Sequence, residues 1–78
     1  MKVTVKLFAT LRKHAHDSEK GLCYVDLNEG STVDCVLKLL NIPEGIPKII
    51  LINGQQKCRD DRLNENDTLS IFPPIAGG

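Results

Sequence analysis

The stretch Met1-Lys2-Val3-Thr4-Val5-Lys6-Leu7-Phe8 decides the fold, because it sets the phase of a β-strand at the start of the chain. Apolar and polar residues alternate along it, which is typical of a strand with one buried face. Val3, Val5 and Leu7 fall on the buried face. Phe8 falls on the polar face, so the pattern predicts a strand that ends with an aromatic ring directed away from the core.

The stretch from Thr68 to Phe72 predicts a last strand with the same exception at its end. Leu69 and Ile71 have the buried phase, whereas Phe72 has the phase of the polar residues. Pro73-Pro74 then ends the strand, since proline cannot donate a hydrogen bond to a sheet. Both phenylalanines of the chain therefore lie on the polar side of a strand end.

A second strand is predicted shortly after the first. Residues 11–21 are polar and charged, which indicates a loop with room for a helical turn. Cys23, Val25 and Leu27 then alternate with polar residues. Two alternating strands this close along the chain favour an antiparallel pair.

One short helix is predicted over residues 33–40. Their apolar residues have the spacing i, i+3, i+4, i+7, which places them on one helix face. Ser31 or Thr32 is the expected N-cap. Asn41, followed by Ile42-Pro43, is expected to end the helix.

The remaining third of the chain predicts a hairpin and a turn-rich segment. Residues 46–52 contain a run of β-branched residues that fits a strand. Asn53-Gly54 is typical of a type I′ turn, and residues 55–58 would form a short polar return strand. Residues 60–67 are rich in turn-forming residues.

The order β-β-α-β-β-β predicts an α+β fold, the ubiquitin-like β-grasp, in which a mixed sheet wraps one main helix. Residues 1–78 would form a single domain with a flexible C-terminal tail over about 75–78. In this fold the first and last strands are parallel neighbours, so Phe8 and Phe72 should lie at the same end of the uncovered sheet face. An exposed apolar patch of this kind favours a docking surface. A twist that tucks one ring inward, or two unrelated surface residues, would be the alternatives.

Composition excludes several classes of function. The ten basic and ten acidic residues leave no net charge and no basic stripe, which argues against a nucleic-acid partner. No run approaches the roughly 18 apolar residues of a membrane span. The start of the chain lacks the apolar block of a signal peptide, so a cytoplasmic protein without a membrane partner is expected.

Metal and redox chemistry receive little support from the sequence. Cys23, Cys35 and Cys58 are odd in number and widely spaced, and they are interpreted as small, partly buried apolar residues. His14 and His16 lack a third fixed ligand, so no metal site is predicted.

The sequence ends in Gly77-Gly78, two residues without side chains. Such an end can enter a channel too narrow for other residues and offers an enzyme its terminal carboxylate. A frayed terminus without a role is the alternative.

Three segments carry a resemblance that covers essentially the whole chain. They are Val5 to Arg12, Leu63 to Leu69, and Phe72-Pro73-Pro74-Ile75-Ala76-Gly77-Gly78. Together they resemble the small sulfur-carrier subunit of molybdopterin synthase, the MoaD-like branch of the ubiquitin-like sulfur carriers (MoaD/ThiS).

The resemblance implies a carrier rather than an enzyme. The carboxylate of Gly78 would be adenylated by a ubiquitin-activating-type adenylyltransferase, and ATP and Mg²⁺ would be used there rather than bound by this chain. A cysteine desulfurase or rhodanese would supply persulfide sulfur, which leaves a thiocarboxylate on Gly78. The large subunit of molybdopterin synthase would then receive the tail, and two deliveries would build the dithiolene that binds molybdenum or tungsten.

The resemblance also assigns residues to docking and to threading. The docking residues would be Phe8, Phe72, Pro73, Pro74 and Arg12. Arg12 would anchor the partner or pair with an acid on its own surface. The threading residues would be Ile75, Ala76 and Gly77.

Two positions depart from the family pattern. Asn66 replaces a turn glycine, and asparagine tolerates the left-handed conformation that the turn needs. Gln55 and Gln56 stand where the family often has an apolar contact residue.

Other functions remain open at this point. A sulfur carrier for thiamine thiazole synthesis or tRNA thiolation would use the same tail chemistry. A ubiquitin-like modifier would join Gly78 to lysines of target proteins. An interaction module would use neither reaction, and its Gly-Gly end would be incidental.

Overall fold

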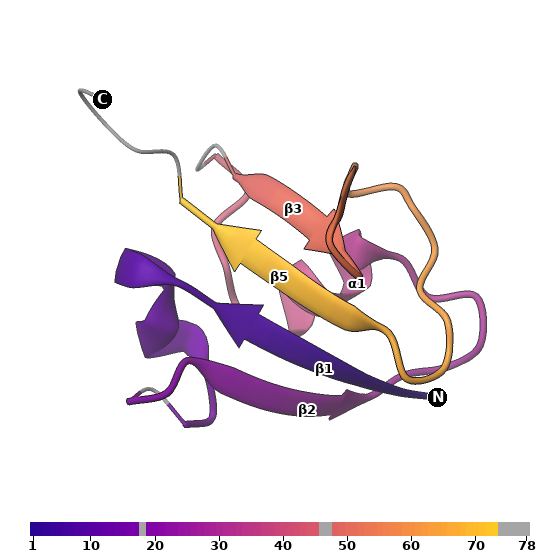
Figure 1. Cartoon of the computed structure of the whole chain (residues 1–78), viewed down its shortest axis with the longest axis horizontal. Coiled ribbons are helices and arrows are strands. Elements are labelled where there is room, and N and C mark those ends of the chain that lie inside the picture. The colour runs from indigo at the N-terminus through magenta and orange to yellow at the C-terminus, as the bar shows by residue number, and fades with distance from the viewer. Residues whose placement is uncertain (18, 46–47, 74–78) are drawn as a thin grey trace.

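A computed structural model of the chain describes residues 1–17, 19–45 and 48–73. Its strands form one five-stranded sheet with the order β2-β1-β5-β3-β4 (Figure 1). The elements are β1 (Lys2–Leu7), the 3₁₀ helix η1 (Ala9–His14), β2 (Leu22–Asp26), α1 (Val33–Leu39), β3 (Ile49–Ile52), β4 (Gln55–Lys57) and β5 (Thr68–Phe72).

The first and last strands are parallel neighbours, as the sequence predicts. Val5 lies opposite Leu69 and Leu7 lies opposite Ile71. The arrowheads of β1 and β5 point toward the same edge of the sheet in Figure 1. The other three strand pairs, β1 with β2, β3 with β5 and β3 with β4, are antiparallel.

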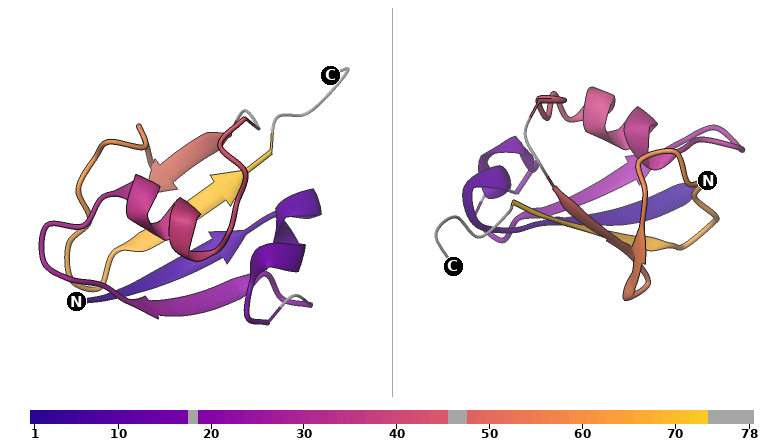
Figure 2. Two further views of the ribbon diagram at one scale, coloured as in Figure 1. Left: turned by 180° about the vertical axis from the view of Figure 1, so that it is seen from behind. Right: turned by 90° about the horizontal axis from the view of Figure 1, so that it is seen from above.

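The helix α1 covers one face of the sheet (Figure 2). Val3, Val5 and Leu7 are at most 2% exposed, so the strand phase read from the sequence is confirmed. The core residues are Val3, Val5, Leu7, Leu11, Cys23, Val25, Val33, Val36, Leu37, Leu40, Ile42, Ile50, Ile52, Leu63, Leu69 and Ile71. A mixed sheet over one helix, in this strand order, is the β-grasp fold.

The helix α1 begins and ends close to the predicted residues. Thr32, rather than Ser31, is the N-cap, with extended backbone and no capping hydrogen bond from its side chain. At the other end Asn41 has a φ of +58°. The amide of Ile42 donates to the carbonyl of Leu37 at 2.9 Å, which closes the helix.

The left-handed turn conformations that the sequence predicts at Asn53-Gly54 and at Asn66 are confirmed. Asn53 and Gly54 have φ values of +52° and +85°, the signs that a type I′ turn requires. Asn66 has a φ of +68°, the conformation expected where a turn glycine is replaced. Asn53 also holds the start of β5, because its side-chain oxygen accepts from the amide of Thr68 at 2.9 Å.

Three boundaries differ from the sequence prediction. The 3₁₀ helix η1 begins at Ala9, before the predicted loop. The strand expected over 46–52 begins at Ile49, and residues 46–47 lie outside the described part of the chain. The return strand ends at Lys57, because the Asp61 carboxylate accepts from the amide of Cys58 at 2.7 Å and draws it into a turn.

None of the helices within residues 1–17, 19–45 and 48–73 has the length and apolar character that a bilayer crossing requires.

Candidate functional site

The rings of Phe8 and Phe72 lie stacked on the sheet face opposite α1. Their centroids are 4.1 Å apart and their planes differ by 9°. The amide of Phe8 donates to the carbonyl of Ile71 at 3.2 Å, which extends the β1–β5 pairing by one step and brings the rings side by side. Both residues are half-buried, so neither ring is tucked into the core. Their predicted placement is confirmed, whereas their docking role stays a prediction.

Ile49 adds a third apolar side chain to this end of the face. It pairs directly with Phe72 across β3 and β5, and it is 42% exposed. Leu51, two residues further along β3, is half-buried. Sequence reasoning missed Ile49 because residues 49–52 are all apolar and show no alternation. Only the pairing register with β5 reveals which of them faces outward.

We call Phe8, Phe72 and Ile49 the apolar row. It runs across three neighbouring strands, β1, β5 and β3, at the end of the sheet where β1 and β5 terminate. Pro73 follows Phe72 directly and is half-buried. Thus the row borders the point from which the final residues continue. Pro74, Ile75, Ala76, Gly77 and Gly78 lie outside the described residues, so the predicted threading segment and the carboxylate are not placed.

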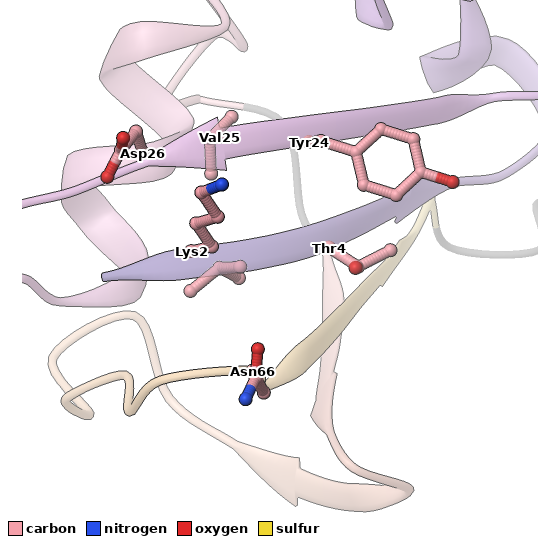
Figure 3. Close-up of a pocket in the computed structure, with 7 residues that line it drawn as sticks. Lys2, Thr4, Tyr24, Val25, Asp26 and Asn66 are labelled. Atoms are coloured by element: carbon pink, nitrogen blue, oxygen red, sulfur yellow. The ribbon is translucent and has the colours of Figure 1, made fainter.

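The opposite end of the same face is polar. Figure 3 shows Lys2 and Thr4 from β1, Tyr24 from β2 and Asn66 from the loop before β5 around a hollow of about 240 Å³. Tyr24 is 71% exposed. The uncovered face is therefore polarised along the strands, and its apolar contact area is concentrated near Pro73.

Arg12 forms no ion pair within the part of the chain that the structure describes, and its predicted role as a partner anchor stays a prediction. Its guanidinium donates to the backbone carbonyl of Glu19, so it is held on its own surface by a carbonyl and not by an acid. Gly21 makes this approach possible. A Cβ there would collide with the carbonyl oxygen of Leu7, and the φ of Gly21 is +71°. Arg12 thus fastens η1 to the loop before β2.

The interpretation of the cysteines is right for only one of the three. Cys23 is 1% exposed, whereas Cys35 and Cys58 are exposed free thiols. Cys35 lies on the outer side of α1, because Val36 and its neighbours take the inner side. A backbone hydrogen bond and then a side-chain hydrogen bond from Thr32 lower the pKa of the Cys35 thiol.

An ion-pair cluster ties α1 to the segment after β4. The guanidinium of Arg59 pairs with Asp34, and it also reaches Glu44 at 3.0 Å. Lys38 pairs with Asp34 at 3.1 Å. Hydrogen bonding to Arg59 and then to Lys38 lowers the pKa of Asp34, and Asp34 in turn raises the pKa of both bases. These residues belong to the helix side of the molecule and not to the uncovered face.

Within residues 1–17, 19–45 and 48–73, no group of three or more His, Cys, Asp or Glu side chains is arranged to hold an ion. His14 is half-buried and His16 is exposed.

Comparison with solved structures finds proteins of the same fold and size. The putative molybdopterin converting factor subunit 1 from Pyrococcus furiosus is 26% identical, with a TM-score of 0.75, over 96% of this chain and 99% of that one. Small archaeal modifier protein 1 from Methanosarcina acetivorans is 27% identical, with a TM-score of 0.71, over 99% and 96%. A chain from the complex of subunits 1 and 2 of the molybdopterin-converting factor from Helicobacter pylori is 21% identical, with a TM-score of 0.64 and full coverage of both chains. This likeness shows the fold alone.

A search of curated proteins finds no match. The model of the ThiS family matches residues 5–78, which include the second half of β1, the aromatic pair and the Gly-Gly end. This chain therefore belongs to the ThiS family, with the ubiquitin-like fold of its molybdopterin-factor and archaeal-modifier neighbours.

Proposed function

We propose that this chain carries sulfur as a thiocarboxylate on Gly78 and delivers it as the small subunit of molybdopterin synthase. The observation that carries the proposal is the stacked, half-buried pair of Phe8 and Phe72 directly before Pro73. It supplies a docking surface beside the segment that ends in Gly77-Gly78. The match to the family model runs through this same segment to residue 78.

Activation of Gly78 is needed because a carboxylate is a poor electrophile. In the proposed first step a carboxylate oxygen attacks the α-phosphorus of ATP on an adenylating partner, and pyrophosphate leaves. A persulfide sulfur on a second partner then attacks the acyl carbon, and AMP leaves with its bonding electrons. A partner thiol finally reduces the resulting acyl disulfide, which releases the thiocarboxylate and forms a disulfide on the partner side.

The chain itself would contribute position and not catalysis. Phe8 and Phe72 would dock on the large subunit, and Pro73-Pro74 would limit the directions in which the tail can leave the sheet. That restriction would lower the entropy lost when Ile75 to Gly78 thread into a partner. The similarity to the putative molybdopterin converting factor subunit 1 from Pyrococcus furiosus supports a recipient in molybdopterin synthesis.

Intact-mass spectrometry tests the proposal. The chain is incubated with its adenylating enzyme, ATP, Mg²⁺ and a persulfide donor, and the exchange of one oxygen for sulfur is expected. Fragmentation should place the sulfur on Gly78, and a variant that lacks Gly78 should stay unchanged. No exchange by the unaltered chain, with an adenylating enzyme shown to be active, would rule the carrier function out.

A protein modifier is the second candidate, and the similarity to the archaeal modifier from Methanosarcina acetivorans favours it. Its Gly78 would form an isopeptide bond with lysines of other proteins. A tagged chain expressed in its own host would then give a ladder of larger species that disappears when Gly78 is deleted. Carriers for thiamine thiazole synthesis or tRNA thiolation would give the mass shift without requiring the molybdopterin large subunit. A plain interaction module would keep its cellular role without Gly78.

A further inference from the structure

Lys6 places an exposed charge on the uncovered face of the sheet, and its register partners on both neighbouring strands are uncharged. The strand registers define which side chains share this face. Its charged members on β1 and β2 are Lys2, Lys6 and Asp26. At one end of the face Lys2 lies directly opposite Asp26, and the carboxylate of Glu65 accepts from the Lys2 amide at 2.5 Å. Asp26 pairs with the N-terminal ammonium of Met1 at 3.6 Å, so acids and bases meet at that end. Lys6 has no acid opposite it on either neighbouring strand.

The neighbours of Lys6 on the face are uncharged. Leu22 lies opposite it on β2, and Ser70 lies opposite it on β5. Phe8 is two residues further along, on the same side and about 7 Å away at the usual rise of a strand. Lys6 is exposed, and it forms no ion pair with residues 1–17, 19–45 or 48–73.

A partner that covers the apolar row must also cover Lys6 or border it. An ammonium group that loses water without gaining an acceptor costs free energy, so an apolar partner surface alone would be penalised here. A carboxylate at the edge of that surface would remove the penalty. It would also set the rotation of the partner, which three apolar side chains fix only loosely.

We propose that Lys6 determines which protein docks, because it selects a partner whose apolar contact region is bordered by an aspartate or glutamate. The inference rests on the proposed function, since it takes the large synthase subunit as that partner. The ammonium of Lys6 would then pair with the partner's carboxylate while Phe8, Phe72 and Ile49 occupy the apolar region.

Binding of Lys6 variants to the large subunit from the same genome tests the inference. Calorimetry at low salt should show about two- to fivefold weaker binding for Lys6→Gln, the range of a partly exposed ion pair. Lys6→Glu should bind more than about tenfold more weakly, because it places like charges together. Lys57→Glu is the matched control, since it makes the same change of charge at an exposed residue of β4 whose register partner, Ile50, is buried. It should bind like the unaltered chain.

A zero-length carbodiimide crosslinker gives a second readout that a general effect of charge would not move. It should join Lys6 to one aspartate or glutamate peptide of the large subunit, and excess salt should reduce that product. Equal binding by Lys6→Glu and Lys57→Glu, or a crosslink of Lys6 only to a second copy of this chain, would overturn this inference. The synthase assignment would not be affected by either result. Failure of the unaltered chain to bind the large subunit would overturn the synthase assignment and this inference with it.

Discussion

Asn66 shows at the scale of one residue how a left-handed turn is kept without glycine. Its φ is +68°, and its amide donates to the carbonyl of Lys2 at 2.8 Å. Most L-residues pay about 1–2 kcal/mol in this conformation. Asn66→Ala should therefore lower the free energy of unfolding by about that amount. For Asn66→Gly the free energy of unfolding should stay within about 1 kcal/mol of that of the unaltered chain.

Urea unfolding followed by circular dichroism measures both variants. Asn64→Ala is the control, because Asn64 belongs to the same loop, is exposed and has no positive φ. Equal losses for Ala and Gly at position 66 would show that the side chain, and not the backbone conformation, matters there.

The residues also show what a sequence can and cannot reveal. Asn53-Gly54 and Asn66 were predicted because the turn conformation follows from the chemistry of these residues alone. Phe8 and Phe72 were predicted because each ends an alternating strand. The outward position of Ile49 was not predicted, since its exposure depends on a register between strands that are distant in the sequence. Arg12 bonds a carbonyl across a loop, and no spacing in the sequence announces such a contact.

At the scale of elements, the ion pairs of Asp34 attach α1 to the segment after β4, and the strength of this attachment should depend on pH. Arg59 lowers the pKa of Asp34 below its ordinary 3.8, so the folded carboxylate stays ionised where the unfolded one is protonated. Its contribution to stability is complete above pH 3.8 and is lost as the pH falls through the lower folded value.

Asp34→Asn should therefore be less stable than the unaltered chain at neutral pH, and this difference should shrink below pH 3.8. Thermal unfolding as a function of pH measures it. Asp60→Asn, an exposed acid in the turn after Arg59, controls for the loss of one negative charge. A difference that stays constant down to the lowest pH would contradict the assigned role of the ion pair.

At the scale of the whole molecule, the two faces of one sheet separate the hydrophobic core from the proposed docking surface. Leu7 and Ile71 are at most 2% exposed beneath the helix, and each is followed by a phenylalanine on the other face. Phe8→Ala or Phe72→Ala loses a stacked pair worth about 0.5–1.5 kcal/mol. Leu7→Ala loses core packing, typically about 2–5 kcal/mol.

The expected result is that either phenylalanine variant stays folded, with a melting temperature lower by several degrees, but binds the large subunit about tenfold or more weakly. Calorimetric melting and titration on the same samples test both parts. Leu7→Ala is the contrasting variant, with a larger loss of stability. Unfolding of Phe8→Ala would instead place that ring in the core.

The position of β5 in the sheet has a consequence for the folding of a newly synthesised chain. Lying between β1 and β3, it joins the β1–β2 pair to the β3–β4 hairpin, and it is synthesised after all four of those strands. Until β5 pairs with both, the chain holds two separate strand pairs with open apolar edges, the kind of species that chaperones bind. A chain cut short before Thr68 lacks β5, so it has neither a joined sheet nor the aromatic pair. Such a fragment is therefore expected to be a target for proteolysis and not a folded domain able to dock.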